Sequence, residues 1–269
     1  CALWCPLNTL PPLLNVTEIH DRKRMPVWFL LAAGGGAVNA SALLACRTFV
    51  SHVTGCLTRF AIDYASFRLL IDYAAVVFAF MLGAITSFWF LDARRLKKKT
   101  PRVATPLALV AIVLTIVAFM GRGGHFGPFG QTVETNGDFV LLGLLAFAMG
   151  LQNACVAITS GMAVRTTHMT GPLTDLSIGL GALLTDVPRS VRRMAKRTVA
   201  LRATKVAGFV TGWMIAAIIA PHVEYGVFLF PAAVTAVGAR LLHMSVASAK
   251  SRAAATDVIP ESVNSVRTP

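Results

Sequence analysis

Long apolar runs constrain this chain more than any other feature of its sequence. Six runs carry few or no charged side chains, and four of them approach or exceed the roughly 20 residues that cross a bilayer as a helix. The runs are Pro26–Cys46, Tyr73–Leu91, Val103–Met120, Phe139–Val164, Val206–Pro221 and Tyr225–Ala239. The last two are shorter, but the side chains of Lys205 and Arg240 can snorkel towards the interface and extend them. The runs predict an all-α membrane protein with six transmembrane helices.

Composition agrees with this class. Hydrophobic residues make up 55% of the 269 residues and charged residues only 14%, whereas soluble domains carry about 25% charged residues. The mean hydropathy of +0.67 is correspondingly high. The chain therefore has the balance of a protein whose partner is a lipid bilayer.

The net charge of +13 reports the orientation of the chain in the membrane. If the amino end is cytoplasmic, the segments on that side are 21–24, 92–102, 165–205 and 240 onward, and they hold 21 of the 25 Lys and Arg residues. Cytoplasmic loops are enriched in Lys and Arg in this way. The bias predicts a bacterial inner-membrane protein with both termini in the cytoplasm. No basic stripe with interleaved aromatic residues is present, which excludes nucleic acid as a partner.

One short motif occurs twice. The chain reads SHVTGCLTRF at 51–60 and THMTGPLTDL at 167–176, so that His52 and His168 stand 116 positions apart. The residues before each motif align at the same offset, and the sequence GAIT from Gly83 resembles GFVT from Gly208 at an offset of 125. Each half then contains three spans. Because three is odd, the second half is predicted to be inverted relative to the first, as in many secondary transporters.

The repeat divides the chain into four parts. Residues 1–26 form an amino-terminal tail, and whether residues 1–24 belong to the mature protein stays open. Residues 27–121 and 138–245 form the two three-span repeats, each with a broken H-x-T-G segment and a short helix. Residues 246–269 are small and polar, and we expect a disordered tail there.

The H-x-T-G motif has two interpretations. Thr54 and Thr170 suit the N-cap of a helix, and the glycine after each permits tight backbone geometry. The amino end of such a helix offers free N–H groups to an anion or carboxylate. The motif therefore either caps a short helix or forms part of a solute site. His52 and His168 are likewise either proton carriers or loop residues that bond backbone carbonyls.

Polar residues inside the apolar runs complete the candidate site. Asn39, Gln152 and Asn153 lie within predicted spans, where polar side chains face either a partner helix or a cavity. The candidate solute-binding residues are His52, Thr54, Gly55, His168, Thr170, Gly171, Asn39, Gln152 and Asn153.

Catalytic and metal-binding signatures are missing from the sequence. It contains no HExxH, GxSxG or P-loop motif, and its five cysteines include no C-x-x-C pair. We therefore expect neither an enzyme nor a metal or cofactor site. Self-association into a homo-oligomer stays open.

A family resemblance rests on three segments. GLQNA at 150–154, RTTHMTGPLTDLSIGLG at 165–181 and FVSHVTG at 49–55 resemble the YoaK-like family of bacterial inner-membrane proteins. The resemblance covers about residues 27–245 and implies a multi-pass membrane protein without a known reaction. This chain departs from many relatives, since Asn39 stands where Asp is common and Cys56 where Asn often follows the Thr-Gly pair. A proton-coupling carboxylate is therefore not expected in the first half.

Together these features favour a small-solute transporter or permease, for a solute that could be anionic. The alternative is a membrane scaffold or lipid-contact protein that transports nothing.

Overall fold

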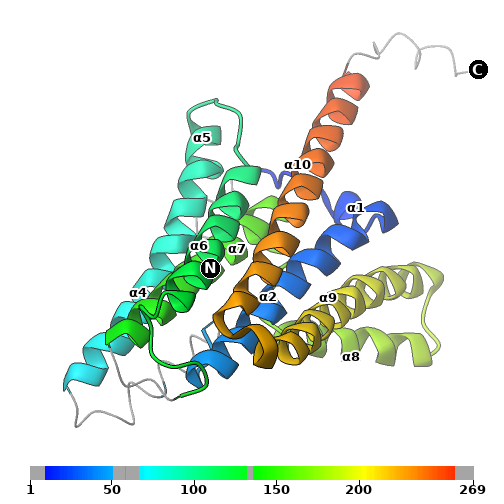
Figure 1. The fold of residues 1–269 in the computed structure, drawn as a ribbon. Helices are drawn as coiled ribbons and strands as arrows, with labels where there is room; N and C mark the ends of the chain where they lie inside the picture. Colours follow the sequence, from blue (N-terminus) through cyan, green and yellow to red (C-terminus); the bar gives the residue numbers. More distant parts are fainter. Residues whose placement is uncertain (1–9, 51–57, 59–66, 132–135, 258–269) are drawn as a thin grey trace, which may run out of the picture.

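The chain is helical throughout its described part. A computed structural model describes residues 10–50, 58, 67–131 and 136–257. The helices are α1 (Val16–Ile19), η2 (Arg22–Arg24), α2 (Met25–Cys46), α4 (Phe67–Phe90), α5 (Asp92–Leu96), α6 (Ala104–Arg122), α7 (Asn136–Thr159), α8 (Thr170–Leu184), α9 (Arg189–Val223), η3 (Glu224–Phe228) and α10 (Leu229–Asp257). No strand occurs in these ranges (Figure 1). The predicted all-α class is confirmed.

Five stretches of the described chain are long and apolar enough to cross a membrane. They are Arg22–Cys46, Tyr73–Leu96, Ala104–Arg122, Asn136–Thr159 and Arg189–Arg252. The fifth has 64 residues and contains two long helices, α9 and α10, which η3 joins at a turn (Figure 1). These stretches indicate an integral membrane protein.

The two ends of the membrane part are more ordered than the sequence suggests. Before α2, the side chains of Leu14 and Ile19 are fully buried, and the indole Nε1 of Trp28 donates to the carbonyl oxygen of Ile19 at 3.0 Å. At the other end, α10 continues to Asp257. It therefore extends into the segment 246–269, which the sequence predicts to be a tail. The added turns contain small alanines and serines, which a helix accepts without needing a buried face.

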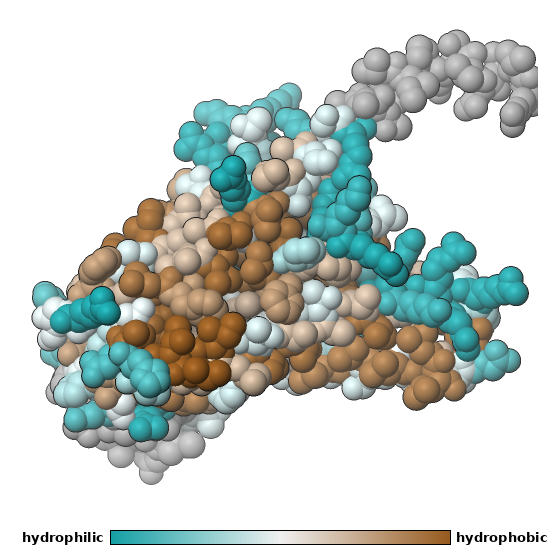
Figure 2. Space-filling model, turned by 45° about the vertical axis from the view of Figure 1, so that its right-hand side comes forward, coloured by the Kyte–Doolittle hydropathy of each residue, from teal (hydrophilic) through white to brown (hydrophobic). Residues whose placement is uncertain are grey.

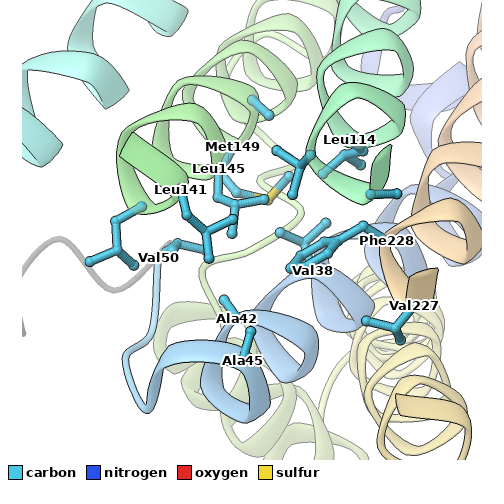
Figure 3. Packing of buried hydrophobic residues seen from close by; sticks show 14 of the residues in the cluster. Val38, Ala42, Ala45, Val50, Leu114, Leu141, Leu145, Met149, Val227 and Phe228 are labelled. Atoms are coloured by element: carbon cyan, nitrogen blue, oxygen red, sulfur yellow. The ribbon is translucent and has the colours of Figure 1, made fainter. Parts of the chain in front are cut away.

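The core lies where α2, α6, α7 and η3 meet. Leu141, Leu145 and Met149 of α7 face Val38 and Ala42 of α2 in this cluster (Figure 3). Leu114 of α6 and Phe228 of η3 close it from the other side. This packing brings α2 and α7, the first long helix of each predicted repeat, into one core.

Two helix pairs pack most extensively, α2 with α9 and α4 with α7. At the first crossing, a Cβ built on Gly36 would lie 2.1 Å from the carbonyl oxygen of Phe209, and one on Gly212 would lie 1.9 Å from that of Ala33. No side chain fits at such distances, so glycine is required at both positions. Small residues allow this close backbone approach between helices in membranes.

The second crossing is built in the same way. A Cβ on Gly150 would lie 2.0 Å from the carbonyl oxygen of Phe80, and one on Gly83 would lie 2.1 Å from that of Phe147. Gly36 of α2 thus corresponds to Gly150 of α7, and Gly212 of α9 corresponds to Gly83 of α4. Each crossing joins one helix from each predicted half of the chain.

The surface separates apolar from charged residues. Figure 2 shows a broad hydrophobic belt with hydrophilic residues gathered along its upper edge and at its ends. Helix α8 and the first part of α9 form a projection at one side of the molecule (Figure 1). Its α8 side exposes Leu173, Ile178, Leu180 and Leu184, whereas the first turns of α9 carry exposed arginines.

Candidate functional site

A cavity of about 790 Å³ lies where the two helix crossings meet the segment before α8. Its size is within the range of small-molecule sites. The lining residues come from α2, α4, α7, α8, α9 and two connecting segments; they are Asn39, Phe49, Phe80, Ala84, Gly150, Asn153, Ala154, Ala157, Met162, Arg165, Thr167, His168, Met169, Thr170, Phe209 and Trp213. The cavity is therefore built from both predicted halves.

Corresponding residues of the two crossings line this cavity as pairs. Asn39 and Asn153 each stand three residues after a crossing glycine, Gly36 and Gly150 respectively. Phe80 and Phe209 each stand three residues before the partner glycine of their crossing. All four of these asparagine and phenylalanine residues line the cavity. The two similar crossings thus present the same residue types to one space.

Asn153 holds the segment that leads into α8. Its Oδ1 accepts hydrogen bonds from the backbone N–H groups of Thr166 and Thr167, both at 3.2 Å, and from the Thr166 hydroxyl at 3.2 Å. Its Nδ2 donates to the Thr167 hydroxyl. Because one side chain satisfies two backbone donors, the 165–169 segment is fixed against α7 with Arg165 and His168 at the cavity.

Gln152 lies behind the cavity wall and joins two helices. Its side chain is fully buried, and its Nε2 donates to the Leu31 carbonyl of α2 at 2.8 Å and to the Thr166 hydroxyl at 3.1 Å. Gln152 is not among the lining residues. Its contacts make it a bridge between α7, α2 and the segment before α8.

The second H-x-T-G motif reaches the cavity through His168 and Thr170. Of the two interpretations of the motif, the structure does not support the cap at Thr170, because α8 begins at Thr170 itself and Met169 occupies the N-cap position without a side-chain hydrogen bond. The hydroxyl of Thr170 is therefore inside the first helical turn, where it cannot reach the N–H groups that a cap would satisfy. Gly171 follows, with the His168 ring 3.6 Å from where its Cβ would lie, an ordinary contact distance.

The first copy of the motif lies outside the described residues. This applies to His52, Thr54 and Gly55, so the expected approach of the two motifs stays a prediction. The residue that precedes the copy by two positions, Phe49, lines the cavity.

Two basic residues of α9, Arg202 and Lys205, are not among the lining residues of the cavity. Arg202 of α9 forms an ion pair with Asp175 of α8 at 2.9 Å and donates to the Ala163 carbonyl at 2.8 Å. Lys205 is fully buried, and its Nζ has no hydrogen-bond partner in the described part of the chain. The expected snorkelling of Lys205 is wrong, because neighbouring helices enclose its whole side chain.

Sequence reasoning missed the aromatic walls of the cavity and Arg165. The signal that could have found the two phenylalanines is the pair FMLG at 80–83 and FVTG at 209–212, which repeats phenylalanine and glycine at one spacing. Trp213 follows the second of these by one residue, as Ala84 follows the first. In the described ranges no three His, Cys, Asp or Glu side chains are grouped as metal ligands would be.

Comparison with known proteins identifies one family. A family model described as "Protein of unknown function (DUF1275)" matches residues 27–241, which contain both crossings and the cavity. Comparisons with curated proteins and with solved structures gave no match.

Proposed function

The chain belongs to the DUF1275 family, and we propose that it is a secondary transporter that carries a small solute across the bacterial inner membrane by alternating access. The observation that carries the proposal is the cavity between two similar helix crossings. Sites of secondary transporters lie between repeats of this kind, near the middle of the bilayer. A scaffold role gives no reason for a cavity of about 790 Å³ between the two crossings.

The proposal includes two inverted repeats, α2–α4–α6 and α7–α9–α10. In this arrangement α2 corresponds to α7, α4 to α9 and α6 to α10. The α2–α9 contact then corresponds to the α7–α4 contact. The smaller α2–α10 contact likewise corresponds to the α7–α6 contact, and the α6–α10 contact corresponds to itself. This pattern supports a pseudo-twofold relation between the halves. The distribution of Lys and Arg supports both termini on the cytoplasmic side.

The crossings suggest which parts would move. Each close pair, α2 with α9 and α4 with α7, is held by backbone contacts at glycine and would behave as a rigid unit. The cavity lies between the two units, so a rocking motion of one against the other would open it first to one side and then to the other. Asn39 and Asn153, one on each unit, would contact the solute in both states.

The two motifs would supply the remaining contacts. His168 and Thr170 already face the cavity, and Gly171 keeps the first turn of α8 small beside them. His52, Thr54 and Gly55 lie outside the described residues and stay predicted members of the same site. Gln152 would position Thr166 and α2 and would not touch the solute.

A lipid-contact role is the second candidate. The exposed apolar residues of α8 beside the basic first turns of α9 favour it, since such a combination binds to membrane interfaces. That role requires no solute to cross the membrane, which separates the two candidates experimentally.

The experiment is uptake into proteoliposomes. Purified protein is reconstituted, and entry of a panel of radiolabelled small acids, amines and neutral compounds is compared with that into empty liposomes. We expect uptake of at least one compound, abolished by Ala154→Phe, which fills the cavity. The matched control Ala108→Phe, at an exposed position of α6, should transport normally. Absence of uptake for the whole panel would refute the transporter, and equal uptake by both variants would show that the solute does not pass through this cavity.

A further inference from the structure

The charge on the described cavity wall has one sign. Arg165 is the lining residue with a permanent charge, and the lining residues include neither Asp nor Glu. A cationic solute would meet repulsion here without any counter-charge, so the wall selects against amines.

The start of α8 adds positive potential at the same place. Thr170, the first residue of this 15-residue helix, lines the cavity, and no side chain caps the turn. The uncapped N–H groups of a helix amino end attract negative charge. Because no side chain caps the first turn of α8, its N–H groups remain available to a ligand.

A buried lysine behind the cavity wall also favours an anionic solute. Lys205, Phe209 and Trp213 follow each other at intervals of four on α9, and the last two line the cavity. The Nζ of Lys205 has no hydrogen-bond partner in the described part of the chain, and the carboxylate of Asp175 is already paired with Arg202 at 2.9 Å. A buried ammonium without a partner is unfavourable, and an anion in the adjacent cavity would offset that cost.

The rest of the wall is apolar and limits the kind of anion. Phe49, Phe80, Phe209 and Trp213 are aromatic, and Met162 and Met169 add flexible apolar surface. A small inorganic anion or a dianion needs many donors to replace its hydration shell, which this wall does not supply. An aromatic or branched carbon skeleton, in contrast, would contact these side chains over most of its surface.

We propose that the solute is an organic monoanion, a carboxylate with an apolar body. Its carboxylate binds at Arg165 and the first turn of α8, and its body lies between Phe80, Phe209 and Trp213. Arginine suits this role because its guanidinium donates two parallel hydrogen bonds to a carboxylate. This inference rests on the proposed function, since it names the chemistry of the solute that the cavity carries.

The test is a binding series of small probes that differ in charge and in whether they carry an aromatic ring. Protein in nanodiscs of zwitterionic phosphatidylcholine is titrated with sodium benzoate, benzyl alcohol, benzylamine, phthalate and inorganic phosphate, and binding is followed by calorimetry. We expect benzoate to bind at least about tenfold more tightly than each of the other four probes. Equal or tighter binding of any of these four, or no binding of benzoate, would overturn the inference.

Variants locate the bound carboxylate. Arg165→Gln should weaken benzoate at least about tenfold, and Arg165→Lys should weaken it less because the charge remains. Arg193→Gln, at an exposed position of the first turns of α9, serves as the control and should bind as the wild type does. An unchanged benzoate affinity in Arg165→Gln would overturn the proposed site. Binding and transport can be separated, because binding needs no transport. Benzoate that binds but is not taken up into liposomes would refute only the proposed transport function. Uptake of neutral probes only would refute only the proposal that the solute is a monoanion.

Discussion

Asn39 and Asn153 occupy the same position in two separate helix crossings and line one cavity together. Each follows by three residues the glycine at which its helix touches the partner, Gly36 in α2 and Gly150 in α7. The pair is 114 positions apart (153 − 39). This relationship is what the predicted duplication would produce, because each predicted half contributes the same amide to one space.

The crossing glycines are expected to control stability. Gly150→Ala should lower the free energy of unfolding by about 1–3 kcal/mol, the usual cost of overpacking, because a Cβ there would lie 2.0 Å from the Phe80 carbonyl oxygen. Gly143 of the same helix has no atom within 4 Å of its Cβ position, so Gly143→Ala should be neutral or stabilising by up to about 1 kcal/mol. Thermal unfolding in detergent compares the two variants. Equal melting temperatures would contradict the close crossing.

The amide of Asn153 is expected to hold the 165–169 segment in place. Asn153→Leu leaves the N–H groups of Thr166 and Thr167 without their acceptor and should cost about 1–3 kcal/mol. Asn153→Asp keeps an oxygen for both donors and should unfold closer to the wild type. Hydrogen exchange at Thr166 and Thr167 is the specific readout, and faster exchange only in Asn153→Leu is the predicted result. Protection of both amides in that variant would show that another group holds the segment.

Lys205 is expected to lower stability while it assists binding. Lys205→Met keeps the shape of the side chain and removes a buried ammonium without a described partner, so the melting temperature should rise. Benzoate affinity should fall at the same time, because the positive potential beside the cavity is reduced. Lys196→Met, at an exposed position of the same helix, should change neither quantity. A lower melting temperature in Lys205→Met would mean that the ammonium has a partner.

Thr170 is expected to act in the cavity and not as a cap. Thr170→Ala should change the free energy of unfolding by less than about 0.5 kcal/mol, because Met169 holds the cap position, yet it should weaken benzoate. Asn15→Ala is the contrasting variant, since the Asn15 side chain accepts from Glu18 N–H at 3.0 Å in a capping box and its loss should cost about 1 kcal/mol. Thermal melting of both proteins decides between cap and cavity roles. A large loss in Thr170→Ala would restore the capping interpretation.

The sequence predicted the positions of the helices well. It was less informative about which residues of the two halves correspond at the helix crossings. Long apolar runs identify spans because a bilayer demands about 20 such residues in a helix, and every predicted run falls largely within a long helix of the structure. The helix crossings pair Gly36 with Gly150 and Gly83 with Gly212, whereas the sequence offsets of 116 and 125 pair Gly34 with Gly150 and Gly83 with Gly208. Three consecutive glycines, Gly34 to Gly36, offered no way to choose among registers, and Gly208 itself packs against the Phe29 carbonyl of α2, with a Cβ position only 2.4 Å away.

Side-chain environments were predictable only where a local pattern encodes them. The polar residues Asn39 and Asn153 stood out against apolar neighbours and do line the cavity. Lys205 resembles a snorkelling residue in sequence, and only the contacts of other helices show that it is enclosed. The aromatic wall comes from α4 and α9, which pack on different partners, so no single segment of the sequence carries its pattern.

Accessibility of the cavity from both sides of the membrane tests the account most directly. The five native cysteines are replaced by serine or alanine, and single cysteines are placed at Ala154 in the cavity, at Lys99 after α5 and at Gln131 after α6. Each variant is treated with a membrane-impermeant maleimide, in intact cells and in inside-out vesicles. Lys99→Cys should react only in vesicles and Gln131→Cys only in cells, which establishes the orientation that the charge distribution predicts.

Ala154→Cys should react from both sides, because alternating access opens the cavity to each in turn, and sodium benzoate should protect it in both preparations. Reaction of Ala154→Cys from one side only, with and without benzoate, would contradict the account.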